Sequence, residues 1–140
     1  MPQPRFVYLI SRARHSLMQN LDAQCLQETG ITATQLGVLF ALKNMDGCRL
    51  SDLSQIMGLD NSAMTTMARR MQVAGVIHKL RCKQDGRAWR VHMTAAGHCC
   101  VVKGKKALAQ VNRQMSEGFS QQEQAICAAF LQQIIDVFEK

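Results

Sequence analysis

The feature of this sequence that most constrains the fold is a change in hydrophobic spacing at Gly75. Before Gly75, apolar side chains recur every three or four residues, which is the period of one helix face. After it they alternate with polar ones, so residues 76–80 and 89–93 are predicted to form two strands around a polar tip that contains glycine. In the second strand Arg90 and His92 would point outward, and their neighbours would face the core. The sequence therefore predicts helices interrupted by one β-hairpin.

Six helices are predicted, with polar N-cap residues and glycines marking most of their ends. They run from Arg5 to Thr29, from Thr32 or Thr34 to Asp46, from Ser51 to Gly58, from Asp60 or Asn61 to Gly75, from Thr94 to Gly118, and from Ser120 to Val137. The third and fourth are short and joined by a tight turn, and the hairpin follows directly. This order predicts a mainly α fold, a winged helix-turn-helix whose fourth helix suits the major groove of DNA.

Composition narrows the class of protein. The 140 residues fit one domain, and no apolar run approaches the roughly 20 residues that span a bilayer. The N-terminus lacks the features of a secretory signal, so we expect a cytoplasmic protein with reduced cysteines. Nucleophile motifs, phosphate loops and metal-ligand spacings are missing, so neither an enzyme nor a cofactor or metal site is expected. The net charge of +7 favours a polyanionic partner.

The fourth predicted helix has two different faces. Met64, Met67 and Met71 form an apolar stripe that would turn inward. The outer face would then carry Ser62, Ala63, Thr65, Thr66, Arg69 and Arg70. Small hydroxyl side chains permit close approach to DNA, arginine can pair with guanine through two hydrogen bonds, and a helix N-terminus attracts phosphate. Taken alone, such a face is equally typical of a helix that is merely exposed to solvent.

The predicted hairpin is strongly basic. Its cations are Lys79, Arg81, Lys83, Arg87 and Arg90, and Asp85 is its only acid. Clustered cations repel one another unless an anion is near, so Lys83, Asp85, Arg87 and Arg90 join the outer helix face as predicted DNA-binding residues. The Asp85 carboxylate would hold the Arg87 guanidinium extended toward a narrow minor groove. The alternative is an exposed ion pair that contributes little to stability.

The stretch from Ile31 to Gly97 resembles the MarR (multiple antibiotic resistance regulator) family. The matching pieces are Ile31-Thr32-Ala33-Thr34-Gln35, Leu50-Ser51-Asp52-Leu53, Met64-Thr65, Arg70-Met71, Asp85-Gly86-Arg87, Val91 and Met93-Thr94-Ala95-Ala96-Gly97. The wing matches the family's pattern best. Its Asp-x-Arg motif is followed by a strand and then by a helix that starts with Thr-x-x-Gly. One departure is Arg69, where the family usually has an acid, and this puts the usual local ion pairing in doubt.

The resemblance implies a single MarR-like domain, residues 1–140. Residues 31–94 would form the DNA-binding winged helix-turn-helix, and residues 5–29 and 95–140 would be dimerisation helices. Apolar positions on the terminal helices independently predict self-association, because they exceed what one small core can cover. A two-fold homodimer would bind a pseudo-palindromic operator with half-sites roughly 34 Å apart. The family also implies a small aromatic effector, with His15 and Met18 in suitable positions, but the effector site stays unknown.

The cysteines and histidines give one candidate regulatory site. His98, Cys99 and Cys100 are sequence neighbours on a helix and point apart, which disfavours a shared metal ion. Cys82 lies between Arg81 and Lys83, and these cations should lower the pKa of its thiol. Cys82 is therefore the predicted thiol sensor, against the alternative of an idle, solvated thiol.

The function expected from all these features is sequence-specific binding to double-stranded DNA by a transcriptional regulator. A ligand- or oxidant-responsive repressor is favoured over an activator, because the chain carries no further domain to recruit polymerase. The alternative is a winged-helix module that binds protein and has no specific DNA target. The basic wing argues for DNA.

Overall fold

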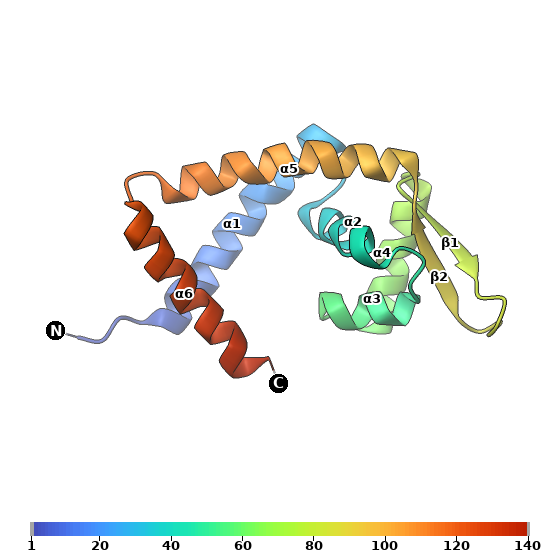
Figure 1. Cartoon of the computed structure of the whole chain (residues 1–140), viewed down its shortest axis with the longest axis horizontal. Helices are drawn as coiled ribbons and strands as arrows, with labels where there is room; N and C mark the ends of the chain where they lie inside the picture. The colour runs from blue at the N-terminus through green and yellow to red at the C-terminus, as the bar shows by residue number, and fades with distance from the viewer. Residues whose placement is uncertain (1, 140) are drawn as a thin grey trace. The chain divides into compact units, whose positions relative to one another are not determined.

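The computed structural model describes residues 2–139. Its helices are α1 (Phe6–Thr29), α2 (Ala33–Met45), α3 (Leu50–Met57), α4 (Asn61–Val73), α5 (Ala95–Ser116) and α6 (Gln121–Phe138), and its strands are β1 (Ile77–Arg81) and β2 (Trp89–Met93). Figure 1 shows the hairpin following α4 directly and leading into α5. The predicted mainly α fold with one hairpin is confirmed, and the first strand lies one residue later than predicted.

The starts of α2, α4 and α6 are fixed by side-chain caps. Thr32 and Gln35 form a capping box at α2, in which the Thr32 hydroxyl accepts from the Gln35 amide and the Gln35 side chain accepts from the Thr32 amide. Asp60 caps α4 by accepting a hydrogen bond from the Ala63 amide at 2.7 Å. Ser120 and Glu123 form a second capping box at α6. These local bonds explain why the helix boundaries were readable from the sequence.

The tight turn between α3 and α4 depends on Gly58. This residue ends α3 with a φ of 64°, a left-handed conformation that side chains with a Cβ rarely adopt. Only Leu59 and the capping Asp60 separate it from α4. Because the turn is so short, α3 and α4 contact each other, and α4 also contacts β1. The helix-turn-helix is therefore formed by a two-helix unit with the hairpin attached to its second helix.

The core lies where the helix-turn-helix meets α2 and the hairpin. Its largest fully buried side chains are Leu36, Leu39, Leu42, Leu53, Met64, Met71, Ile77 and Val91. On α5, Gly104 packs against the Leu36 side chain so closely that a Cβ would overlap it. This contact seats the first half of α5 on α2, so the beginning of α5 is part of the same core.

The hairpin is antiparallel, with Ile77 opposite Met93 and Arg81 opposite Trp89. Val91 and Met93 are buried and His92 is half-buried, which confirms the predicted alternation for these three residues. Trp89, which was also expected to face the core, is only half-buried, as is Arg90. Arg49, just before α3, forms an isolated antiparallel β-bridge with Arg90 of β2. The residues before α3 thereby attach the hairpin to the helix-turn-helix.

The chain divides into two compact units, residues 1–108 and 109–140. The second unit contains the end of α5 and all of α6, and no residue of α6 is buried. The predicted division into dimerisation helices and a DNA-binding part stays a prediction. Among residues 2–139, no helix is both long and apolar enough to cross a membrane.

Candidate nucleic-acid interface

Helix α4 presents a polar face to solvent. Met64, Ala68 and Met71 are fully buried, and Met67 is half-buried. The side chains predicted for the outer face are exposed in five cases, at Ser62, Ala63, Thr65, Arg69 and Arg70, and half-buried in one, at Thr66. The predicted separation of the two faces is therefore present in the structure.

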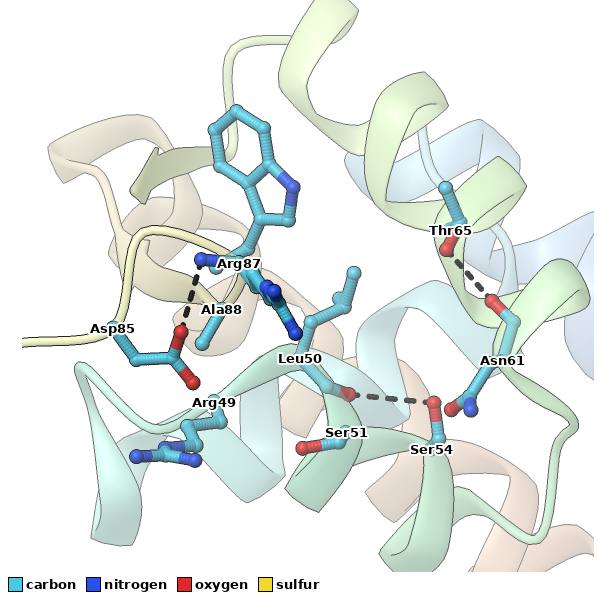
Figure 2. Close-up of a pocket in the computed structure, with 10 residues that line it drawn as sticks. Arg49, Leu50, Ser51, Ser54, Asn61, Thr65, Asp85, Arg87 and Ala88 are labelled. Carbon is cyan, nitrogen blue, oxygen red and sulfur yellow. Dashed lines mark hydrogen bonds between the residues drawn. The ribbon is translucent and has the colours of Figure 1, made fainter. Parts of the chain in front are cut away.

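A groove of about 290 Å³ lies between α3, the start of α4 and the wing. It is lined by Arg49, Leu50, Ser51, Ser54, Asn61, Thr65, Asp85, Arg87, Ala88 and Trp89. Figure 2 shows Arg87 and Asp85 on one side of this groove, Thr65 and Asn61 on the other, and Ser51 and Ser54 between them. The wing and the two helices of the helix-turn-helix thus contribute hydrogen-bonding side chains to one hollow.

The polar side chains of the groove are partly held by their own helices. The Thr65 hydroxyl donates to the Asn61 carbonyl at 2.7 Å, and the Ser54 hydroxyl donates to the Leu50 carbonyl at 3.3 Å (Figure 2). A hydroxyl that donates backward along its helix keeps its oxygen lone pairs available as acceptors. The groove therefore offers oriented acceptors from α3 and α4 together with cations from the wing and from Arg49.

The wing tip differs from the expectation in one respect. The Asp85 carboxylate accepts a hydrogen bond from the main-chain amide of Arg87 at 3.0 Å, and the Asp85 carbonyl accepts from the Ala88 amide at 3.0 Å. Among the described residues, His92 and Asp46 are the only acidic and basic side chains within 4.0 Å of each other, and no carboxylate lies that close to an arginine or lysine side-chain nitrogen. Asp85 thus shapes the turn through the main chain rather than pairing with the Arg87 guanidinium, which extends exposed beside the groove.

Other predicted residues of α4 lie outside the groove. Ser62, Ala63, Thr66 and Arg70 line a different cavity of about 570 Å³, together with residues from α1 and from the start of α2. Arg69 is exposed and lines neither space. The outer face of α4 therefore contributes residues both to the groove and to this second cavity.

The two remaining wing cations differ in their surroundings. Lys83 is exposed, and no hydrogen-bond or ion-pair partner is found for its side chain within residues 2–139. Arg90 is half-buried, and its guanidinium donates to the Gly47 carbonyl at 3.1 Å. Arg90 thereby ties the hairpin to the turn after α2, and it lies on the opposite hairpin face from Val91. Neither residue lines the groove.

Cys82 is buried at the base of the wing tip and is only 6% exposed. Hydrogen bonds from the main chain at Asp85, from the Arg90 side chain and from the main chain at Gln84 lower the pKa of its thiol. The lowered pKa was expected, but its causes are these donors rather than the neighbouring Arg81 and Lys83. A cavity of about 300 Å³ opens beside Cys82 and is lined by side chains that include Arg81, Lys83, Arg90 and His92.

Seven of the ten residues that line the groove were missed by sequence reasoning: Arg49, Leu50, Ser51, Ser54, Asn61, Ala88 and Trp89. Ser51 was identified only as a helix start, and Trp89 only as a core residue. Asn61 was considered only as a cap, and Arg49 was not considered. A signal existed for Arg49 and Trp89, because a cation just before a helix and a tryptophan in a basic hairpin are both unusual for a solvated surface. Their shared groove depends on tertiary packing that no local pattern records.

The residues considered for effector or metal binding are dispersed. His15 is exposed and Met18 half-buried on α1. Within residues 2–139, no group of three or more His, Cys, Asp or Glu side chains is arranged to hold a metal ion. The structure therefore adds no support for His15 or Met18 as effector ligands, and their role stays a prediction.

Two short helices joined by a glycine turn and followed by a basic hairpin define a winged helix-turn-helix fold. The MarR family model matches residues 31–89. A Bacillus subtilis protein named as an uncharacterised helix-turn-helix-type transcriptional regulator, YdgJ, is 26% identical over 98 residues, which are 70% of this chain and 60% of that protein. The chain spans 60% and 61% of the lengths of the two curated relatives it matches.

Solved structures agree along nearly the whole chain. A probable transcriptional regulator from Pseudomonas aeruginosa is 25% identical to this chain, with a TM-score of 0.76. The match covers 94% of this chain and 100% of that protein. MepR from S. aureus, solved with DNA, has the same fold with a TM-score of 0.84 at 19% identity, covering 97% and 100% of the two chains. The chain is therefore similar to the MarR family over residues 31–89, and its two curated relatives are named as transcriptional regulators.

Proposed function

We propose that this protein is a transcriptional regulator that binds a specific site on double-stranded DNA. The groove between α3, α4 and the wing carries the proposal, because it joins Arg87, Thr65 and Ser51 in one hollow. In this arrangement the start of α4 enters the major groove and the wing reaches the adjacent minor groove. MepR, which shares the fold, was solved bound to DNA, and this supports the same class of partner here.

The proposed roles follow from the chemistry of each side chain. Arg87 is exposed, which suits insertion into a narrow minor groove. Ser62, Ala63, Thr65 and Thr66 lie near the helix N-terminus, where small side chains let main-chain amides approach phosphate. Arg69, Arg70 and Lys83 are exposed cations that we assign to phosphate or base contacts. Asp85 and Arg90 shape and anchor the wing, and any direct contact of theirs with DNA stays a prediction.

We further propose that the protein acts as a homodimer and represses transcription by covering a pseudo-palindromic operator. Helix α6 has no buried residue, and it exposes large apolar side chains: Ile126, Phe130, Leu131, Ile135, Val137 and Phe138. The start of α1 also exposes large apolar residues. Water-exposed surface of this kind on two helices is typical of a dimer interface.

Two signals are proposed to release the operator. One relative, PcaV from Streptomyces coelicolor, was solved in complex with its natural ligand, which supports a small-molecule effector for this fold. A small aromatic effector is our proposal for this chain. The other signal is oxidation of Cys82, supported by the hydrogen bonds that favour its thiolate and by the basic cavity beside it. Replacing Cys82 by serine should abolish oxidant-dependent release.

The first experiment is selection of bound sequences from a random duplex pool, followed by titration of the enriched site at several salt concentrations. An inverted repeat should be enriched, and its affinity should fall steeply as salt rises, because phosphate contacts release counterions. If no sequence is enriched, or if only salt-sensitive nonspecific binding remains, the proposed function is wrong.

Charge reversal at Arg87 separates DNA binding from the alternative of a protein-binding module. The Arg87→Glu variant should bind the operator more weakly by roughly 1 to 3 kcal/mol, whereas a protein-docking surface elsewhere would be unaffected. Lys106→Glu is the matched control, because Lys106 is exposed on α5, outside the groove, and the substitution changes the net charge equally. Equal losses for the two variants would show that only overall charge matters.

A further inference from the structure

Arg81 occupies an unusual place at the end of β1. Its guanidinium donates a hydrogen bond to the Gly86 carbonyl at 2.6 Å, reaching across the wing tip. The same guanidinium lies 4.7 Å from the centre of the Trp89 ring, in cation–π contact. Arg81 therefore joins the base of the wing to its tip and to a residue that lines the groove.

The Trp89 ring is held by a second cation from the same strand. The Lys79 ammonium lies 4.6 Å from the ring centre, and Lys79 and Arg81 are two residues apart, so both side chains leave the same face of β1. Trp89 is paired with Arg81 across the hairpin. We define the Arg81, Trp89 and Gly86 contacts as the wing clamp.

The wing clamp acts on the residues around Arg87. Gly86, whose carbonyl is held by Arg81, immediately precedes Arg87, while the Asp85 side chain holds the Arg87 amide. The Cys82 amide donates to the Ala88 carbonyl at 2.8 Å and closes the loop from the other side. The main chain of Arg87 is thus fixed at its amide and at the preceding carbonyl, although its side chain is exposed.

We propose that Arg81 is a positioning residue for DNA binding, which sets the wing tip through Gly86 and Trp89 so that Arg87 reaches the minor groove. The inference rests on the proposed DNA-binding function. Direct phosphate binding by Arg81 is the competing explanation, because the residue is a surface cation. The two explanations differ in whether the effect of Arg81 depends on Arg87.

A double-mutant cycle on the enriched operator tests this dependence. Arg81→Gln should weaken binding about tenfold, the size expected for losing one groove contact. In the Arg87→Ala background, the same substitution should change affinity less than about twofold, because the group that the wing clamp positions is already gone. Equal losses in the two backgrounds would overturn the proposal. Lys83→Gln is the control: Lys83 is exposed in the same loop, and its loss should be the same in both backgrounds.

A conservative substitution and a spectroscopic signal make the test independent of charge. Arg81→Lys keeps the charge but lacks the planar fork that bonds a carbonyl while stacking on a ring, so it should bind as weakly as Arg81→Gln. Because Trp89 is the only tryptophan, its emission reports on the wing. Arg81→Gln should shift this emission in the free protein, and Lys83→Gln should leave it unchanged.

Each remaining outcome has a definite meaning. Affinity restored by Arg81→Lys, or unchanged Trp89 emission in Arg81→Gln, would overturn the wing clamp. Thermal unfolding of every variant shows whether it is folded before its affinity is interpreted. If the wild-type protein enriches no operator, the proposed function fails and this inference fails with it. If the wild type binds an operator and the cycle is additive, only the inference about Arg81 fails.

Discussion

Three carboxylates near the groove accept hydrogen bonds from main-chain amides. Asp52 accepts from the Arg49 amide, Asp60 from the Ala63 amide, and Asp85 from the Arg87 amide. Each carboxylate therefore acts on the main chain beside it, at a helix start or in the wing tip. Among the described residues, none of the three lies within 4.0 Å of an arginine or lysine side-chain nitrogen, so these acids are present beside the proposed DNA-binding surface without forming ion pairs with its cations.

Cys82 provides a prediction at the scale of one thiol. Its pKa is lowered by hydrogen bonds from the main chain at Asp85 and from Arg90, whereas burial raises the pKa of the Cys100 thiol. Alkylation rates follow the thiolate fraction. The alkylation rate of Cys82 should reach its half-maximum at lower pH in the native protein than in urea, and that of Cys100 at higher pH. Mass spectrometry of each cysteine after timed labelling measures both.

The same shift has a consequence for stability. Because the folded state favours the Cys82 thiolate, deprotonation stabilises the fold. This contribution is fully present above the usual pKa of a thiol and is lost as the pH falls through the lowered value. The difference in unfolding free energy between wild type and Cys82→Ser should therefore grow toward alkaline pH. A difference that is constant with pH would show that the thiolate is not stabilised in the fold.

At the scale of single elements, the cap of α4 tests what fixes the start of this helix. The Asp60 carboxylate is the side-chain acceptor for the Ala63 amide. Asp60→Ala should lower the free energy of unfolding by about 1 kcal/mol, and Asp60→Asn should keep most of it, because asparagine caps helices equally well. Urea unfolding at one fixed protein concentration measures both variants. An alanine variant as stable as wild type would contradict the role of this cap.

Elements were predictable where their determinants are local. Thr32, Asp60 and Ser120 cap helices through amides three residues away, so the sequence spacing alone indicates the boundaries. Arg90 shows the opposite case. Its partner, the Gly47 carbonyl, is 43 residues away, so no spacing rule indicates that this cation anchors the hairpin. The contact between Asp85 and the Arg87 amide was within reach of turn rules, but two opposite charges suggested an ion pair instead.

At the scale of the whole molecule, α6 tests the proposed dimer. Ile126 is 70% exposed. Ile126→Glu should convert dimer to monomer and weaken operator binding, because a buried charge without a partner opposes association. Ala125→Glu is the matched control, since it adds the same charge on the helix side that carries Gln132 and Asp136. Analytical ultracentrifugation measures both variants, and a dimeric Ile126→Glu protein would exclude this face from the interface.

The division of α4 into two faces has a consequence for how a protein with the proposed function can change over time. Its buried side comprises Met64, Ala68 and Met71, and none of these residues lines the groove. Its outer residues are exposed, and substitutions at exposed positions rarely cost much stability. Methionine is unbranched and adapts to small shifts of its neighbours. The scaffold can therefore acquire new sequence preferences by surface substitutions alone, so that binding specificity and folding evolve largely independently in this helix.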